Sequence, residues 1–595
     1  MSEFEIQSWL LLTILPEIRL FLLLLASLWG TYAVNFTDCF INFRHNASLT
    51  LNTSGLVDEN GGNIANTSPE ILQAVGFTYD ACLSQCGPGT QKPTWANTSQ
   101  QFSAWLLPYL ALISQLPFGA RHRVDNFMSA ILTVGSPVLA GYSMILTILN
   151  ARWISRRFEN VSFPNARHAV RILISLQQTP LKITNEDSLL SSLIVLPEND
   201  DWWPTIADFL DYTLTWSIAS ATCIAWVIVA YLLTVVGSLS DVNANINSNG
   251  QGAGSVWLWL IPIVIGWLQL SPKCDYVRIR RAMDNADAMA FVATHHGVMK
   301  ASDLSERRAI SIDSTLEQPS SPDENSTPPV YNYARAIPWS RSAEDVFDAF
   351  RMASNNSRMH RPVRVGDIWK NAGGRDVIEP SNRSGNPSEV NAYCRLPRHA
   401  APRYGIRSPW ASGIFFRMFV ASLLPIALQW ATTGAAVLVV YFTPAVGLGC
   451  RSLGYIIYGA LATMVWAMLV TSSIISHYTY SYSGRSSWSP FFSITMRLAK
   501  VLSNLLRWGG KFLAIVNAIW VVTASMLQFA NIYDSCYCNS SVMGRGVQHA
   551  YGIVVIDNLD LGSTEAAWWG ALALACSTSL GFIFLMSLLT DCVPT

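Results

Sequence analysis

Long apolar blocks alternate with polar segments along this chain, and the blocks have the composition of helices that cross a membrane. A span takes about 20 apolar residues. Residues 1–33 add a signal peptide or a further first span, because the apolar core 20–28 ends in small residues that suit signal cleavage. The pattern predicts an all-α, polytopic membrane protein with seven or eight transmembrane helices. The seven predicted spans are residues 127–149, 213–236, 255–270, 414–442, 453–475, 512–530 and 566–589.

An eighth internal apolar run, residues 102–119, precedes the first of these spans and is interrupted by Pro108, Gln115 and Pro117. If residues 34–102 lie outside and residues 150–212 lie in the cytosol, only one of the two runs can cross. The uninterrupted run 127–149 suits a span better. Region 103–149 is therefore expected to hold a re-entrant or interfacial helix followed by one span.

The polar segment 272–410 sets the orientation, because it holds 20 of the 39 Lys and Arg residues and they flank the neighbouring apolar blocks. Basic residues close to a span favour the cytosolic side. Its middle, 311–329, has almost no apolar residues and is expected to be disordered. The same orientation makes 150–212 a cytosolic lobe, 213–271 a transmembrane hairpin and 411–595 a membrane domain of four spans.

The segment 34–102 and the loop 531–565 carry the signs of an extracellular or lumenal location. N-glycosylation sequons begin at Asn35, Asn46, Asn52, Asn66, Asn97 and Asn539. Six cysteines fall in or beside these segments: Cys39, Cys82, Cys86, Cys450, Cys536 and Cys538. An oxidising compartment favours disulfides among them, in any of about 15 pairings. A small ectodomain held by disulfides is therefore expected.

Composition narrows the function classes. The chain is 51% hydrophobic and 13% charged with a formal net charge of zero, so it offers no general attraction to nucleic acid. The interiors of the predicted spans hold no Asp, Glu, Lys or Arg, which argues against a proton-coupled transporter or pump. The polar residues Gln429, Asn517 and Gln528 remain, and helix–helix hydrogen bonds are their simplest explanation.

Two stretches are candidates for chemistry at the membrane surface. Asp200 and Asp201 could hold a cation or a metal–diphosphate group, but they stand before a Trp pair and a proline that suit an interfacial helix start. Residues 491–508 form a basic amphipathic stripe that could lie on an anionic leaflet or pack beneath the bundle. His295-His296 is expected in a solvated helix, and no catalytic motif, metal-ligand spacing or cofactor signature is present.

The stretches LLPYLALISQLPFG from Leu106, DNFMSAILTVGSPVLAGYSMILTILNARW from Asp125 and LPENDDWWP from Leu196 carry a family resemblance. They resemble uncharacterised multi-pass membrane proteins of filamentous fungi, over most of the chain. The resemblance implies the same membrane architecture in a fungal secretory-pathway or plasma membrane, and carries no activity or functional residue with it.

These observations favour a non-enzymatic sensor, scaffold or accessory factor of the secretory pathway or plasma membrane. Its expected partners are membrane lipids and cytosolic proteins bound to residues 272–410. A facilitative transporter or channel for a small molecule or lipid, serving secondary metabolism, is the first alternative. A membrane-embedded enzyme acting on lipid-linked substrates through Asp200 and Asp201 is the second.

Overall fold

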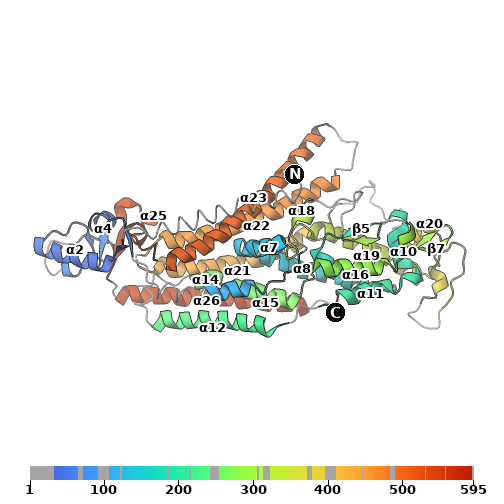
Figure 1. The fold of residues 1–595 in the computed structure, drawn as a ribbon, viewed down its shortest axis with the longest axis horizontal. Helices are drawn as coiled ribbons and strands as arrows, with labels where there is room; N and C mark the ends of the chain where they lie inside the picture. The colour runs from blue at the N-terminus through green and yellow to red at the C-terminus, as the bar shows by residue number, and fades with distance from the viewer. Residues whose placement is uncertain are drawn as a thin grey trace.

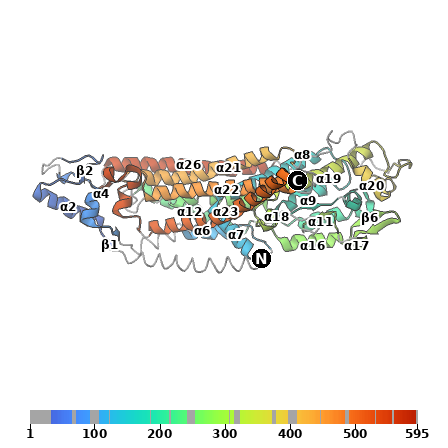
Figure 2. The same cartoon turned by 90° about the horizontal axis from the view of Figure 1, so that it is seen from above.

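The computed structural model has three parts that follow one another along its longest axis (Figure 1). A small unit whose cysteines lie in pairs at disulfide distance forms one end. A helical bundle forms the middle, and a larger lobe forms the other end. Figure 2 shows the same order after a quarter turn. The described residues are 33–64, 71–91, 106–120, 123–184, 186–212, 216–240, 253–304, 307–312, 322–371, 378–395, 410–444, 446–482, 490–529, 531–555 and 558–591.

The bundle is built from long apolar helices, of which six among the described residues are long and apolar enough to cross a membrane. The main helices are α8 (Pro137–Phe158), α12 (Ile218–Ser240), α21 (Ile414–Phe442), α22 (Cys450–Tyr482), α23 (Pro490–Phe529) and α26 (Asn558–Asp591). Shorter helices complete it: α6 (Leu107–Ile113), α7 (Arg123–Gly135), α14 (Ala253–Trp257) and α15 (Leu260–Leu270). The expected span 255–270 thus consists of the two short helices α14 and α15.

The run 127–149, expected as a span, is not one continuous helix, because the chain breaks into α7 and α8 at Ser136, and α8 is itself long and apolar enough to cross a membrane. Pro137 at the start of α8 has no N–H for a helical hydrogen bond. The α7 end meets the middle of α23, where a side chain on Gly135 would lie 2.2 Å from the Ala514 carbonyl oxygen. Only glycine permits this close approach.

The two helices form a hairpin that begins and ends at the lobe end of the bundle. Residues 119 and 120 precede α7, and the Tyr276 N–H of the lobe donates to the Gly119 carbonyl at 3.1 Å. At the apex, the Ser136 hydroxyl donates to the Ala462 carbonyl at 2.7 Å in the middle of the bundle. Residues 106–119, which were expected to be re-entrant, instead run toward the lobe, and α7 and α8 turn back to it.

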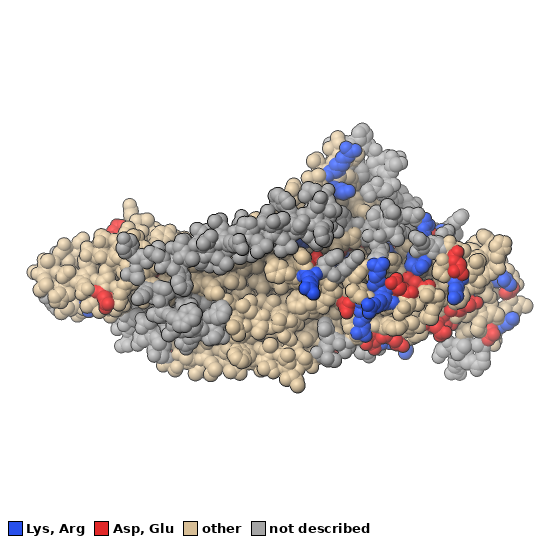
Figure 3. All heavy atoms as spheres, in the orientation of Figure 1, with Lys and Arg blue, Asp and Glu red and all other residues tan. Residues whose placement is uncertain are grey.

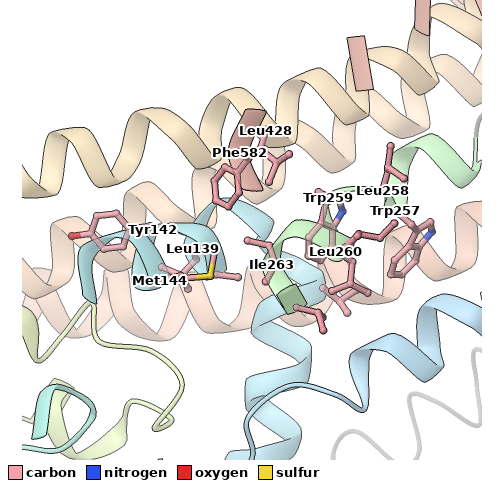
Figure 4. Packing of buried hydrophobic residues seen from close by; sticks show 14 of the residues in the cluster. Leu139, Tyr142, Met144, Trp257, Leu258, Trp259, Leu260, Ile263, Leu428 and Phe582 are labelled. Atoms are coloured by element: carbon pink, nitrogen blue, oxygen red, sulfur yellow. The ribbon is translucent and has the colours of Figure 1, made fainter. Parts of the chain in front are cut away.

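The polar residues of the bundle close this break, as expected for helix–helix hydrogen bonds. The Asn517 amide donates to the Gly135 carbonyl at 2.8 Å, and the Gln429 side-chain oxygen accepts from Val138 N–H at 3.3 Å. Apolar packing surrounds them: Leu139 and Met144 of α8 lie in one cluster with Ile263 of α15, Leu428 of α21 and Phe582 of α26 (Figure 4). Buried hydrogen bonds of this kind hold helices together where apolar contact gives little net drive.

The lobe joins both segments that were expected to be cytosolic around one apolar core. Trp202 and Trp203 are fully buried in it, and Trp203 donates from its indole to the Leu193 carbonyl at 3.1 Å. The helices of the lobe are α9 (Ala166–Ser175), α10 (Leu189–Val195), α11 (Trp202–Leu210), α16 (Tyr276–Asp287), α17 (Ala301–Leu304), α18 (Pro322–Ser326), α19 (Ala336–Arg358) and α20 (Pro387–Cys394). Short 3-10 turns lie at Leu176–Gln178, Glu186–Ser188, Pro197–Asn199 and Pro380–Arg383.

Strands are few and short. In the lobe, β5 (Lys182–Ile183) pairs with β8 (Ile310–Ser311), and β6 (Phe291–Thr294) pairs with β7 (Gly297–Lys300), all antiparallel. His295 and His296 form the exposed turn between β6 and β7, so the helix expected there is wrong. Both histidine side chains are therefore exposed to solvent.

The small end unit combines the N-terminal segment with residues 531–555. Helices α2 (Phe36–Thr50) and α4 (Tyr79–Cys86) pack with α24 (Cys536–Asn539) and α25 (Val542–Arg545). Its strands are β2 (Leu56–Val57), β3 (Gly76–Thr78) and β9 (Tyr551–Ile553) in one antiparallel sheet, and the parallel pair β1 (Ala33–Val34) and β4 (Thr90–Gln91). A 3-10 turn, Val547–His549, precedes β9. Because β9 extends the sheet of the N-terminal strands, the two distant segments fold as one unit.

Helices α22 and α23 form an antiparallel hairpin whose tip leaves the bundle at an angle (Figure 1). The apolar face of 491–508 is exposed there: Ile494, Leu498, Val501, Leu502, Leu505 and Trp508 are each about half or more accessible. Packing beneath the bundle, one of the two alternatives for this stretch, is therefore wrong for these side chains. An apolar surface that stays open is compatible with the other alternative, contact with a leaflet.

Candidate functional site

Residues 322–335 connect the lobe to the bundle through a buried polar junction. The sequence predicts disorder over 311–329, and residues 313–321 lie outside the described residues. Residues 322–329 are packed, however: α18 buries the side chains of both Asp323 and Glu324, with 2% and 3% of their surface exposed. Carboxylates are almost never buried to this degree without partners.

Asp323 is paired with a cation of α23. Its carboxylate forms an ion pair with the Arg507 guanidinium and accepts a hydrogen bond from the Ser472 hydroxyl of α22 at 3.0 Å. One helical turn further, Lys511 donates to the Ser326 carbonyl at 2.7 Å. Arg507, which the sequence places on a leaflet-facing stripe, is therefore buried, and it holds α18 against the α22–α23 hairpin.

Glu324 is held from the lobe side. The Lys182 ammonium of β5 lies 3.3 Å from its carboxylate. The Arg335 guanidinium is buried next to it and donates to the main-chain carbonyls of Glu324 at 3.0 Å and Tyr331 at 3.2 Å. Burial lowers the pKa of Arg335 to about 10, so this guanidinium remains charged at neutral pH and clamps the turn.

The following residues anchor the segment in the bundle. The Tyr331 hydroxyl lies 2.6 Å from that of Thr133 in α7, and the Asn332 amide donates to the Thr147 hydroxyl of α8 at 2.8 Å. The Ser473 hydroxyl of α22 donates to the Tyr333 carbonyl at 2.8 Å. Three bundle elements therefore hold one short segment of the lobe, and a movement of any of them must change these contacts.

The sequence contains a signal for this site that prediction missed. Arg507 and Lys511 stand one turn apart at the start of an apolar helix, where cations need a counter-ion. Asp323 supplies that counter-ion from 184 residues away in sequence. A single sequence gives no means to pair positions so far apart, which is why the junction was not predicted.

The predicted pair Asp200 and Asp201 lies apart from this junction, at the lobe surface. The Asp200 carboxylate accepts two hydrogen bonds from the Arg383 guanidinium, at 2.6 and 2.7 Å, and one from the Asn165 amide at 2.9 Å. Asp201 is exposed at the start of α11. Within the described ranges no three His, Cys, Asp or Glu residues are grouped as metal ligands would be.

These contacts give the two aspartates different expected roles. Replacing Asp200 by Asn should lower the free energy of unfolding by about 1–3 kcal/mol, since Arg383 loses a charged hydrogen-bond partner. The Asp201→Asn variant, as the matched control, should unfold like the wild-type chain. Thermal unfolding of both in detergent checks this. Equal losses of function in two stably folded variants would instead favour a shared cation site.

The last residue of α16, Asp287, is a mostly buried carboxylate of the lobe with a pKa near neutral. The Asp287 side chain is 13% exposed and lies 3.6 Å from the Arg308 guanidinium. Burial raises the pKa of Asp287 to about 7, from an ordinary value of about 3.9, and Arg308 partly opposes this rise.

Because the folded chain binds this proton more tightly than the unfolded chain, the contribution of Asp287 to stability should fall as the pH rises from about 4 to about 7. The Asp287→Asn variant should lose that part of the pH dependence and be the more stable protein at about pH 8. Unfolding temperatures across the range measure it. An unchanged pH profile in the variant would contradict this assignment.

The six predicted cysteines lie in pairs at disulfide distance in the structure. The pairs are Cys39 with Cys86, Cys82 with Cys536, and Cys450 with Cys538, with Cα–Cα distances of 5.9, 5.7 and 5.2 Å. The second pair joins the N-terminal segment to residues 531–555, and the third joins the start of α22 to the same region. Cys223, Cys274, Cys394 and Cys576 have no such partner among the described residues.

Three predicted glycosylation sites, Asn35, Asn46 and Asn52, are exposed on the small end unit. Asn539 is partly exposed, and its side-chain oxygen lies 3.4 Å from the Arg451 guanidinium. Asn66 and Asn97 lie outside the described residues. Exposure makes Asn35, Asn46 and Asn52 accessible to a glycosyltransferase. Glycosylation of all six asparagines stays a prediction.

Comparisons of the chain with protein-family models, with curated proteins and with solved structures give no match.

Proposed function

We propose that this chain is a multi-pass membrane glycoprotein of the secretory pathway or plasma membrane, with its small end unit outside and its lobe in the cytosol. The placement of charge supports a membrane location for the bundle. On the face shown in Figure 3, Lys, Arg, Asp and Glu gather over the lobe, and few of them lie on the part of the bundle surface that is not drawn in grey. A charge-poor bundle beside a charged lobe is what a bilayer requires.

The three cysteine pairs are proposed to be disulfides of the ectodomain, because both partners of each pair then face an oxidising compartment. In this arrangement α7 and α8 enter from the cytosolic side and return to it. Their apex at Ser136 lies in the interior of the bundle, where the Asn517 and Gln429 side chains satisfy main-chain groups of Gly135 and Val138.

The proposed function is a non-enzymatic sensor or scaffold that links the ectodomain to the cytosolic lobe. One observation carries it: the α22–α23 hairpin is joined to the ectodomain by Cys450–Cys538 and to the lobe by Arg507–Asp323. A packed helical pair fixed at both ends supplies a contiguous physical connection between two sites. A change in the ectodomain would thereby bias the contacts of residues 322–335.

Hydrogen exchange on the purified full-length chain tests this connection. Replacing Cys450 and Cys538 by Ala removes the covalent link between the start of α22 and residues 531–555, and exchange within residues 322–335 should then become faster. The Cys39→Ala/Cys86→Ala variant is the matched control, since that pair lies within the N-terminal segment. Equal exchange in residues 322–335 of all three proteins would contradict the sensor proposal.

A scaffold also needs partners on its cytosolic surface, and residues 272–410 remain the proposed place for them. Cross-linking of the full-length protein in membranes should give protein partners whose links concentrate on α16 and α19. Links confined to the ectodomain would contradict a cytosolic scaffold.

A facilitative transporter is the second candidate, and the broken pair α7–α8 favours it. Helices that end inside a membrane bundle form substrate sites in many transporters. Flux into vesicles that depends on the protein, and that falls in an Asn517→Leu variant, would support transport. The enzyme alternative loses support, because the Asp200 carboxylate is taken up by Arg383.

A further inference from the structure

Basic residues follow the apolar helix α15 directly, where the chain leaves the bundle and enters the lobe. Lys273, Arg278 and Arg281, here called the boundary cations, belong to this segment and to the start of α16. Arg280 lies among them and pairs with Asp284 at 3.9 Å. Lys and Arg clusters immediately next to a membrane span are typical of segments that bind anionic lipids.

One aromatic ring holds two of the boundary cations together. The Lys273 ammonium and the Arg278 guanidinium lie 4.8 and 4.2 Å from the centre of the Tyr212 ring. Lys273 also donates to the Tyr212 main-chain carbonyl, and the Tyr212 hydroxyl accepts from the Asp275 N–H at 3.3 Å. Cation–π contacts position a cation without neutralising its charge. Two positive charges are therefore held in place beside one ring.

The carboxylates next to this ring have other partners. Asp211 forms an ion pair with Arg171 at 3.0 Å. The Asp275 side chain caps α16 by accepting from the Arg278 N–H at 3.1 Å. Among the described residues, no ion pair joins a boundary cation to a carboxylate. This surface therefore carries an excess of positive charge that an anionic group can neutralise.

An exposed apolar surface begins close to the boundary cations. Trp216 stands four residues after Tyr212, so the chain keeps it within about 14 Å of that residue. Trp216 and Ile218, the first residue of α12, are 50% and 88% exposed, and Trp is typical of membrane interfaces. Helix α12 lies along one edge of the bundle (Figure 1), and Leu233 and Val236 are exposed further along it. A lipid at this edge can therefore contact the cations with its headgroup and α12 with its acyl chains.

We propose that the boundary cations bind the headgroup of an anionic glycerophospholipid in the leaflet that meets the lobe, with its acyl chains along α12. Arg278, held on the Tyr212 ring, donates to the phosphate, and Lys273 and Arg281 add positive charge beside it. The excess of cations selects an anionic lipid over a zwitterionic one. This inference rests on the proposed membrane location of the bundle, and it holds whichever way the chain crosses the membrane.

Native mass spectrometry of the full-length protein in detergent tests this, with phosphatidylserine and phosphatidylcholine of identical acyl chains as probes. Phosphatidylserine should bind about tenfold more tightly. The Arg278→Gln/Arg281→Gln variant should weaken phosphatidylserine binding about tenfold or more, since two cations next to the headgroup are lost. Arg281→Gln alone leaves the Tyr212 contacts intact and should weaken it about fivefold. The matched control is Arg361→Gln/Arg364→Gln, which removes two exposed arginines beyond the far end of α19, about 33 Å along that helix from the junction.

Phosphatidylcholine that binds as tightly as phosphatidylserine, or equal losses in the double variant and its control, would overturn the assignment. Water-soluble glycerophosphoserine should bind much more weakly than the lipid, and equal binding would show that the occupant is not a lipid. Release of the wild-type chain from membranes by alkaline carbonate would instead refute the membrane location. Failure of the proposed function is therefore distinguishable from failure of this site.

Discussion

The Asp323→Ala variant should lose about 3–5 kcal/mol of folding free energy, the loss expected when one partner of a buried ion pair is removed. The Asp323 and Arg507 side chains are 3% and 10% exposed. Removing the carboxylate leaves the guanidinium buried without its counter-ion, and the desolvation penalty of Arg507 is then no longer offset. Thermal unfolding in detergent should show a clear decrease, together with faster hydrogen exchange in residues 322–335.

The control is Asp284→Ala, because Asp284 is 70% exposed and its contact with Arg280 is a surface pair. It should unfold close to the wild-type temperature. The double variant Asp323→Asn/Arg507→Gln should lose less than the sum of its single changes, since it leaves no unpaired charge. Asp323→Ala and Asp284→Ala with the same stability would show that the junction does not hold α18.

Replacing Cys82 or Cys536 by Ser should give the second large effect, about 2–5 kcal/mol in the ectodomain. This pair is separated by 454 residues and joins the N-terminal segment to residues 531–555. Without it, the contact of β3 with β9 is held by short-strand hydrogen bonds and the small cluster around Phe40 and Phe77. Limited proteolysis of intact cells or vesicles should cleave residues 33–91 sooner in the variant.

Thiol labelling of the same variants tests directly whether Cys82 and Cys536 form a disulfide. In Cys536→Ser, the thiol of Cys82 should react with a membrane-impermeant maleimide without prior reduction, while the wild-type chain should not react. Cys223→Ser serves as the control, because Cys223 is unpaired in α12. Labelling of Cys82 in the unreduced wild-type protein would contradict the pairing.

The sequence predicts the helical architecture and the six ectodomain cysteines because these follow from local composition and from counting. Which apolar run folds back does not follow from composition. Residues 102–119 and 127–149 are both apolar enough to enter a membrane. The sequence Gly135-Ser136-Pro137, which favours a helix break, lies inside the second run, the one predicted to span. Continuity of hydrophobicity favours one helix over 127–149, whereas this short signal ends α7 at Gly135 and starts α8 at Pro137.

The polar residues show a second limit. Asp200 and Asp201 look equivalent in sequence, and only the fold brings Arg383 to one of them. The segment 322–329 looks disordered because it is polar, yet it is ordered by Arg507, Lys511 and Lys182 from distant elements. Burial of a charged residue depends on its partner, and partners far along the chain are supplied by tertiary structure alone.

The orientation of the two polar ends is the central claim, and glycosylation of single-sequon variants measures it most directly. Asn46 is exposed on the end unit, and Asn160 and Asn325 are exposed on the lobe. A variant that keeps only the Asn46 sequon should shift on glycosidase treatment, whereas variants that keep only Asn160 or Asn325 should not. Modification of Asn160 or Asn325 with none at Asn46 would place the lobe outside and contradict the proposed sensor and its cytosolic partners together.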